Sequence, residues 1–532
     1  ERLIQAWSGK PTQHILYQQA QECALRFREL CYRDNLLDFS LQLEVFRQHL
    51  WPSLICRSYL KQTYHHLIYD NIEEDFPVAH DCMAEWLPDF QSALLIMDED
   101  AGFRTFLGVD VSSASRLAAL CTGSLRTQDS FVTQSNMQDL ETVLSESIQK
   151  LPHPNQTNNN QTAFTINSCR FYPQAIDQVV NEVQKLILDQ GVNPSEIAIL
   201  TPFLSDALRF AFSARLEAAG VPYTTYRPSR SLRDEPVVKA ILTFARLANP
   251  TWAMQPHLQD VRDAFHVAFY GCDLVRSDLL AQILYKPLSA PDSLKPFQPV
   301  NPEKQARITY LIGERYEQLR EWLTANRDQG SLELDHWISR LFGEVLSQPG
   351  FGLHTDFEGA TLVARLIESA RKFRQSLTTP KEPIPPFGKE YLRVLESGIL
   401  SAQSLSVFEE QSQADTVFLS PAFSFLMRNR PVRVQFWVDI GSQGWWSRLD
   451  QPLTQPYVLN RNWSEDRKWT DEDEFLNNQR SLLRVVKGLI RRCYGQIHMS
   501  TITLNEQGVE ERGALVLAMQ DVLRSQGKGA HG

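Results

Sequence analysis

Two short apolar runs in the first hundred residues end in acidic side chains. LIYDNIEED places Asp70, Glu73 and Glu74 behind one run, and ALLIMDED places Asp98 behind the other. A short apolar run that ends in this way is typical of a buried parallel strand whose carboxyl end carries a site. The pattern predicts a site built from carboxylates. The alternative is that the acids only solvate the strand ends.

Basic residues form the second set that could carry chemistry. The net charge of −10 is uninformative about nucleic acid, because binding depends on a local basic track and not on the total. Clusters of this size can also be solvated faces. The local stretches are Arg227, Arg230 and Arg233, then Arg428, Arg430 and Arg433, and finally Arg484, Lys487, Arg491 and Arg492.

Length and composition limit the class of protein. At 532 residues the chain is long enough for two to four domains with ordinary apolar cores. Its eight cysteines include no CxxC pair and no cluster at zinc spacing, so we expect reduced thiols. No apolar run approaches the roughly 18 residues of a membrane span, and the start lacks the order of a signal peptide. We therefore expect a cytoplasmic protein with no membrane partner.

The elements that must position these residues follow an α/β pattern. Helical patterns dominate the first ninety residues, apart from the two strand-like runs. A polar stretch at 122–162, ending in LPHPNQTNNNQT, is predicted to be a loop or linker. Strands then alternate with helices through TAFTINSC, EIAILTPF and VPYTTY, which predicts a second α/β layer structure with a parallel sheet.

A long helical stretch interrupts this second α/β region. Strand signals vanish from about 250 to 375, where Ile308, Leu311, Ile312, Leu319, Trp322 and Leu323 fall on one helical stripe. The proline-rich TTPKEPIPPFGKE closes the stretch, and strands return with TVFLSPAF, VQFWVDIG and QIHMSTIT. The second α/β domain is therefore predicted to be split. The predicted segments are 1–121, 122–162, 163–250, 251–395 and 396–532.

This layout and several local strings resemble UvrD-like superfamily 1 DNA helicases. NLLDFSLQL at 35–43 is similar to the family segment that precedes the Walker B strand. The more than fifty residues from EIAILTPF to FARLANP are similar to the start of the second motor domain. The resemblance implies an α/β fold with two RecA-like domains, the first incomplete, and a large all-helical insertion in the second. It also implies ATP and Mg²⁺ as cofactors and single-stranded DNA as partner.

The Walker B motif of that family would fall on LIYDNIEED. Asp70 takes the position that holds magnesium, whereas Asn71 stands where the family has its catalytic glutamate. Glu73 and Glu74 occupy the next two motif positions. An amide cannot accept a proton from water, so the change at Asn71 would remove general-base catalysis. In the next motif Asp98 and Phe106 match, while Ala101 and Leu107 replace polar residues of the family.

Three arginines align with nucleotide contacts of the family. The segment LLRVVKGLIRRC resembles the last motif and places Arg492 at the arginine that reaches the γ-phosphate, with Arg484 at an earlier basic position. Arg209 could replace an arginine that the family has near Pro202. The alternative for Arg492 is that it caps the C-terminus of a helix.

The resemblance also marks candidate nucleic-acid contacts and missing motifs. Phe103, Phe106, Trp445 and Trp446 are candidates for stacking on bases, and Arg433 is a candidate for a phosphate contact. For Phe106 and for one of the two tryptophans, the favoured alternative is a position in the buried core. LSVFEEQSQAD lacks the His, Lys and Gly of the penultimate motif. The only Gly-Lys near the start is in SGKPT, which is not a phosphate loop, so the sequence is expected to begin inside the first domain.

Two functions remain open from the sequence. The first is an ATP-dependent DNA helicase or translocase of repair or recombination, inactive as given because it lacks the phosphate loop. The second is a non-catalytic, helicase-like scaffold subunit that works with a nuclease or repair protein.

Overall fold

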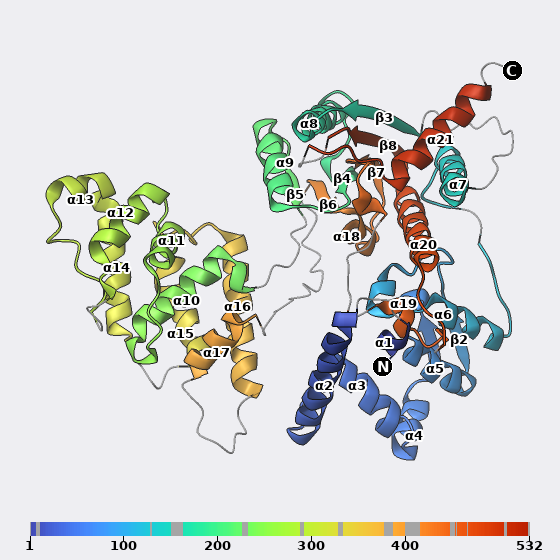
Figure 1. Ribbon diagram of the computed structural model, residues 1–532, viewed down its shortest axis with the longest axis horizontal. Coiled ribbons are helices and arrows are strands. Elements are labelled where there is room, and N and C mark those ends of the chain that lie inside the picture. The colour runs from blue at the N-terminus through green and yellow to red at the C-terminus, as the bar shows by residue number, and fades with distance from the viewer. Residues whose placement is uncertain are drawn as a thin grey trace. The chain divides into compact units, whose positions relative to one another are not determined.

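The computed structural model describes residues 2–6, 11–127, 130–150, 163–225, 232–287, 292–327, 333–376, 387–398, 415–446, 453, 455–464, 466–504 and 508–529. Within these ranges the protein is a mixed α/β protein with parallel sheets, as predicted (Figure 1). The chain divides into two compact units. Unit 1 comprises Glu1–Arg227 and Glu410–Gly532, and unit 2 comprises Pro228–Glu409.

The first part of unit 1 contains a small parallel sheet with helices around it. Strands β1 (His66–Tyr69) and β2 (Ser92–Leu95) pair in parallel, with His66 opposite Ser92. Its helices are α1 (Arg2–Ala6), α2 (Pro11–Arg33), α3 (Phe39–Val45), α4 (Leu54–Thr63), α5 (Pro77–Trp86) and α6 (Val111–Leu117).

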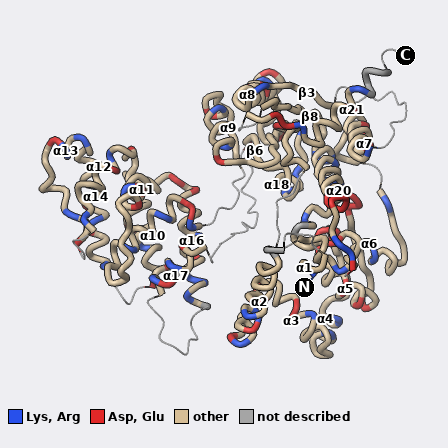
Figure 2. The backbone as a smooth tube through the Cα atoms, in the orientation of Figure 1, with Lys and Arg blue, Asp and Glu red and all other residues tan. Residues whose placement is uncertain are grey.

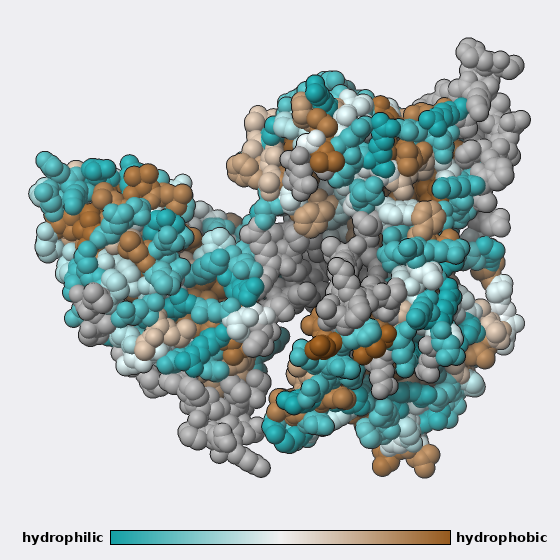
Figure 3. Space-filling model, in the orientation of Figure 1, coloured by the Kyte–Doolittle hydropathy of each residue, from teal (hydrophilic) through white to brown (hydrophobic). Residues whose placement is uncertain are grey.

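The predicted burial of these two strands is wrong. Ile68 of β1 is 76 % exposed and Leu94 of β2 is 54 % exposed. The reason is that Tyr69 and Leu95 pack against α6 on one face of the sheet, whereas the alternating residues Ile68 and Leu94 point to the opposite face. Apolar side chains also reach the surface on α4, where Leu54 and Ile55 are both more than four-fifths exposed (Figure 3).

The second part of unit 1 is a six-stranded parallel sheet in the order β3-β8-β7-β4-β6-β5. Helices cover both faces, so the central strand β4 is buried throughout its length. The strands are β3 (Phe164–Cys169), β4 (Ile197–Thr201), β5 (Tyr223–Thr225), β6 (Val417–Pro421), β7 (Val432–Trp437) and β8 (Cys493–Ile502). The helices are α7 (Ser135–Gln149), α8 (Tyr172–Leu188), α9 (Asp206–Ala218), α18 (Ala422–Met427), α19 (Pro456–Leu459), α20 (Asp471–Ile490) and α21 (Ala514–Gly529).

Alternation along β4 explains how one strand supports two hydrophobic cores. Ala198 and Leu200 pack with α7, α18, α20 and α21, whereas Ile197 and Ile199 pack with α8 and α9. Successive side chains of a strand point to opposite faces, so a run of apolar residues suits a sheet covered on both sides. The continuous apolar string IAIL at 197–200 is therefore the pattern that this position requires.

The chain leaves the sheet after β5, forms unit 2, and returns with β6. β6 lies between β4 and β5 and pairs with both in parallel. The strings EIAILTPF and TVFLSPAF therefore belong to one sheet, in agreement with the predicted split of the second α/β region.

The prediction of a loop or linker at 122–162 is wrong for part of this stretch, which forms a helix with a buried face. Residues Ser135–Gln149 form α7, which packs against α20 and α21. Met137, Leu140, Leu144 and Ile148 are buried along one side of it. This three- and four-residue spacing is a helical stripe, which the surrounding Ser, Gln and Thr residues conceal in the composition. Residues 151–162 lie outside the described residues.

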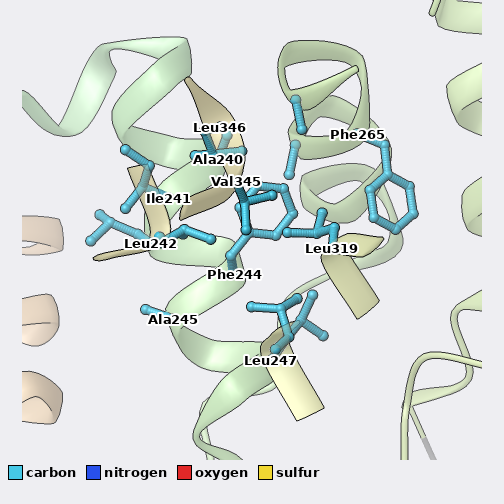
Figure 4. Packing of buried hydrophobic residues seen from close by; sticks show 14 of the residues in the cluster. Ala240, Ile241, Leu242, Phe244, Ala245, Leu247, Phe265, Leu319, Val345 and Leu346 are labelled. Carbon is cyan, nitrogen blue, oxygen red and sulfur yellow. The ribbon is translucent and has the colours of Figure 1, made fainter. Parts of the chain in front are cut away.

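Unit 2 is all helical in the described ranges. Phe244, Phe265, Leu319 and Val345 come from four different segments and point toward one another in its core (Figure 4). Its helices are α10 (Pro236–Ala248), α11 (Leu258–Ala268), α12 (Leu274–Leu284), α13 (Pro302–Ile308), α14 (Tyr310–Ala325), α15 (Leu334–Leu341), α16 (Phe357–Ser376) and α17 (Phe387–Glu396).

The boundary of unit 2 differs from the predicted residue 251. The unit starts at Pro228, because α10 packs against α11 and α16 of this unit and contributes most of its length to the core. Most of the proline-rich connector and of the LSVFEEQSQAD string lie outside the described residues.

Candidate functional site

The acidic ends of β1 and β2 meet, as the sequence predicts. Because the two strands are parallel, the residues that follow them lie at the same edge of the sheet. The backbone N–H of Ile72 donates to the carbonyl of Ile96 at 3.2 Å, and the N–H of Asp98 donates to Glu73 Oε2 at 3.2 Å. Carboxyl groups from two strand ends are therefore brought into one cluster.

Glu74 is fully engaged by a loop. Its Oε1 accepts hydrogen bonds from the backbone N–H groups of Gly102 at 2.9 Å and Phe103 at 2.7 Å, and its Oε2 accepts one from Arg104 at 3.1 Å. Gly102 has a φ of 93°, which lets the backbone turn toward the carboxylate. Glu74 therefore fixes this loop, with three hydrogen bonds from backbone N–H groups to its two oxygens.

Glu73 is a buried carboxyl group. It is 1 % exposed, and burial raises its pKa, with the neighbouring charges of Asp98 and Glu74 acting in the same direction. The hydrogen bond from the Asp98 backbone opposes this rise without reversing it. Glu73 therefore favours its neutral form more than an exposed glutamate does.

Asp70 and Asn71 are the exposed members of the cluster. Asp70 Oδ1 accepts a hydrogen bond from the Asn71 N–H at 2.9 Å. Asn71 adopts a left-handed conformation with a φ of 53°, which asparagine tolerates better than most residues. Asp70 could provide one oxygen ligand to Mg²⁺, and in nucleotide sites that ion takes further ligands from phosphates and water.

Helix α20 brings basic side chains to this cluster. Arg484 Nη1 donates to Thr105 Oγ1 at 3.1 Å, and Lys487 Nζ lies 3.2 Å from Asp100 Oδ2. Arg491, just beyond the helix, forms ion pairs with both Asp100 and Glu141. Burial would raise the pKa of Asp100, but its contacts with Arg491 and Lys487 outweigh burial and lower it.

Arg492 follows α20 and faces the same loop. Its guanidinium lies 5.6 Å from the centre of the Phe103 ring, and its Nη2 donates to Asn429 Oδ1 at 2.8 Å. Burial lowers the pKa of Arg492, while the nearby charges of Asp98 and Glu74 raise it. Burial likewise lowers the pKa of Arg484, with Glu74 among the groups that oppose it. The two arginines predicted as nucleotide contacts therefore lie within electrostatic reach of the predicted acidic residues.

Two of the predicted basic stretches come together here. The hydrogen bond from Arg492 to Asn429 joins the end of α20 to the turn before β7. Arg430 of this turn and Arg433 at the start of β7 are exposed. No ion pair joins Arg430 or Arg433 to an acidic group in the part of the chain that the structure describes. Arg227 and Arg230, of the remaining basic stretch, lie outside the described residues.

Arg209 does not join this cluster. It lies on α9, 3.6 Å from Asp206 and near Tyr223 of the edge strand β5. None of its described contacts reaches Asp70, Glu73 or Asp98. The structure thus gives no support to Arg209 as a nucleotide contact.

Two of the predicted stacking residues are wrong for that role. Phe103 is 8 % exposed and packs on α20, where a Cβ at Gly488 would lie 2.7 Å from its ring. Trp445 is 5 % exposed, and its Nε1 donates to the carbonyl of Asp439 at 2.9 Å. Trp446 is half-buried beside Phe475, with ring centres 5.2 Å apart. The side chain of Phe106 lies outside the described residues.

The comparisons add no family. Neither a scan against protein-family models nor a search of curated proteins returns a match for this chain.

The carboxyl ends of β4 and β7 carry two buried polar groups that the sequence did not indicate. Asp439 lies just beyond β7 and is 3 % exposed, and Tyr172 donates its hydroxyl to Asp439 Oδ2. Asp439 Oδ1 and Thr201 Oγ1 have no protein hydrogen-bond partner among the described residues. Burial raises the pKa of Asp439 to about 6. The only sequence signal is an acidic residue after the apolar string VQFWV.

A pocket of about 320 Å³ lies beside the start of α20, and we name it the α20 pocket. It too was missed, because its lining combines residues 457–469, before α20, with residues of α20 itself and with Asp110 and Ser112, which are distant in the sequence. The first turn of α20 is acidic throughout (Figure 2). Among the lining residues are Asp110, Tyr457, Asn462, Trp463, Trp469 and Arg480.

The described residues contain neither a cluster of metal-ligating side chains nor a membrane-spanning helix. In the described ranges, no three His, Cys, Asp or Glu side chains lie together as a protein-only metal site would require. No described helix combines the length and the apolar character needed to cross a membrane.

Proposed function

We propose that this chain is a helicase-like, single-strand-binding module of the UvrD-like type that does not itself hydrolyse ATP. The observation that carries the proposal is that Arg484 and Arg492 contact Thr105 and Phe103, in the loop whose backbone N–H groups bind Glu74 behind β1. In the UvrD-like helicases that this sequence resembles, an arginine of the last motif and the Walker B carboxylates act on one nucleotide. The parallel sheets are compatible with the two RecA-like domains that the resemblance implies.

The chemistry of the acidic cluster argues against hydrolysis. A general base must accept a proton from water within hydrogen-bonding reach. Asn71 cannot do so, Glu74 already accepts three backbone hydrogen bonds, and Glu73 is buried. Asp70 and Arg492 could still contact Mg²⁺ and phosphate oxygens, so nucleotide binding without turnover fits these residues.

Single-strand binding is supported by the exposed arginines. Arg430 and Arg433 lie beside the end of α20 and are not neutralised by ion pairs among the described residues. Arginines of this kind can contact backbone phosphates, which gives binding that weakens as salt rises.

A scaffold role in a repair nuclease complex is the second candidate. It is favoured by the exposed apolar side chains of Leu54 and Ile55 on α4, which a partner protein could cover. A nuclease or another repair protein would be that partner. DNA binding separates the two candidates.

The experiment measures binding and turnover in the same preparation. A labelled oligo(dT) should bind at about 50 mM salt, a range in which phosphate contacts are strong, and should dissociate as salt rises. Arg433→Ala should weaken binding, whereas Arg340→Ala, on α15 of unit 2, serves as the control. ATP should not be hydrolysed with or without DNA. Phosphate release that Asp70→Ala abolishes would contradict the non-hydrolysing assignment, and failure to bind DNA would leave the scaffold role.

A further inference from the structure

Aromatic rings form one side of the α20 pocket. Tyr457 of α19 stacks on Trp469 with ring centres 5.5 Å apart and an interplanar angle of 19°, and Trp463 lies 5.4 Å from Trp469. The volume of about 320 Å³ falls in the range of pockets that hold small ligands, about 300 to 1,000 Å³. The pocket is therefore large enough for a planar ring system against these side chains.

Amide and carboxyl groups form another part of the lining. Asn462 Nδ2 donates to Asp110 Oδ2 at 3.0 Å and lies 3.1 Å from Ser112 Oγ. Burial would raise the pKa of Asp110, but its hydrogen bonds, chiefly those with Ser112, outweigh burial and lower it. Amide and carboxylate groups of this kind recognise the edges of nucleobases through hydrogen bonds.

The pocket is lined by two aspartates and two arginines, and one of the arginines, Arg480, could face a bound anion. Arg467 forms an ion pair with Asp473 and covers the Trp463 ring at 4.5 Å, so these two charges offset each other. Asp110 is held by hydrogen bonds on α6. Arg480 of α20 is exposed and has no ion pair with a described acidic residue. Its positive charge lowers the pKa of the neighbouring Arg484, so an anion bound here would reduce the repulsion between the two arginines.

We propose that the α20 pocket binds one nucleotide unit, with its base against Trp463 and Tyr457 and its phosphate at Arg480. The ligand class is a nucleotide within single-stranded nucleic acid, an assignment that rests on the proposed function. A free nucleotide has the same chemistry and is the alternative source. Base stacking on aromatic rings is sequence-tolerant, so the contacts with Trp463 and Tyr457 add affinity without selecting a sequence.

Ultraviolet cross-linking to oligo(dT) followed by peptide mapping locates the contact in the unmodified chain. The expected cross-links fall on the peptide that spans residues 455–469. Competition with dTMP identifies the source. If only a second oligonucleotide suppresses the cross-link, the ligand is a single strand. If dTMP suppresses it at a similar concentration, the pocket binds free nucleotide, which supports the chemistry of the site.

Two variants test the roles of the side chains. Trp463→Ala should weaken oligo(dT) binding about tenfold, the size expected when one base loses its stacking partner. Arg480→Ala should reduce the salt dependence, lowering the slope of log affinity against log salt by about 0.7, as for one lost phosphate contact on a single strand. Arg524→Ala, with a side chain that is 74 % exposed on α21, is the matched control and should change neither quantity.

The outcomes separate this inference from the proposed function. Tight oligo(dT) binding with no cross-link in 455–480, and with Trp463→Ala and Arg480→Ala both unchanged, overturns the pocket and leaves the proposed function intact. If oligo(dT) does not bind but dTMP does, and Arg480→Ala abolishes dTMP binding, the pocket stands and the proposed function fails. Absence of binding by both ligands overturns both.

Discussion

Replacing Asp439 by asparagine should stabilise the six-stranded sheet at neutral pH and leave its stability nearly unchanged in acid. Burial raises the pKa of this carboxyl group from 3.8 to about 6. Each pKa unit corresponds to about 1.4 kcal/mol, so ionisation of Asp439 costs the folded state about 3 kcal/mol. Asparagine keeps an oxygen for the Tyr172 hydroxyl and carries no charge.

The direction with pH follows from protonation in the folded and unfolded chains. Below pH 3.8 the carboxyl group is mostly protonated in both states, so it imposes no penalty. Between pH 3.8 and 6 the unfolded chain ionises while the folded chain stays neutral, and the free energy of unfolding falls. Above pH 6 the loss is complete. Asparagine also tolerates the left-handed φ of 54° at this position, which adds only a small gain that does not depend on pH.

Hydrogen exchange of the β7 and β8 amides measures the free energy of opening of the sheet near Asp439. The exchange rates are corrected for the intrinsic effect of pH. Asp439→Asn should raise the opening free energy by about 3 kcal/mol at pH 8 and by a few tenths at pH 4. Asp473→Asn is the control, and it should lower the free energy of unfolding at pH 8. The reason is that hydrogen bonds from Thr470 and contact with Arg467 lower the pKa of Asp473 despite its burial. A gain at pH 8 no larger than that at pH 4, or a loss at pH 8, would refute the reasoning.

Two other pairs of variants test single contacts. Glu74→Ala should destabilise the loop amides that it binds by about 1–3 kcal/mol, seen as faster hydrogen exchange, because three donors lose their acceptor. Glu73→Gln should be neutral or stabilising at pH 7, since burial already favours the uncharged form; equal losses in the two variants would contradict this. Gly313→Ala should lower the stability of unit 2 by about 1–3 kcal/mol in thermal unfolding, because its Cβ would lie 2.2 Å from the buried Phe297 ring. Gly343→Ala has no atom within 4 Å and should not destabilise; a stable Gly313→Ala protein would show that the ring can move.

The strands could be predicted because apolar pattern alone specifies them. IAIL is a continuous apolar string and VQFWV is apolar except for Gln435, and both occupy positions with helices on each side. The helical stripe at 308–323 was only partly right. Thr309 has a φ of 83°, ends α13 and starts α14, so Leu311 becomes 57 % exposed while Leu319 stays buried. A local turn of this kind changes the phase of the helix, and periodicity does not detect it.

The candidate site was less predictable because its roles depend on tertiary contacts. Asp70 and Asn71 could be placed from their neighbours in the sequence. Whether Glu74 faces solvent or a loop, and whether Trp445 lies at the surface or in the core, depends on residues distant in the chain. The α20 pocket was missed for the same reason, although three aromatic residues in a polar loop are a signal that could have been used.

The order of strands in the large sheet limits when it can form. β3, β4 and β5 are made first, yet none of them pairs with another of the three. β3 pairs with β8, and β4 pairs with β6 and β7, so the early strands have neighbours only after unit 2 has been synthesised. During translation unit 2 can fold as a compact body. The apolar strands β3, β4 and β5 stay unpaired until β6, β7 and β8 have been synthesised. Exposed strand edges of this kind are prone to aggregation. A chain that stops before Cys493 lacks β8 and leaves the edges of β3 and β7 unpaired, so we expect it to aggregate.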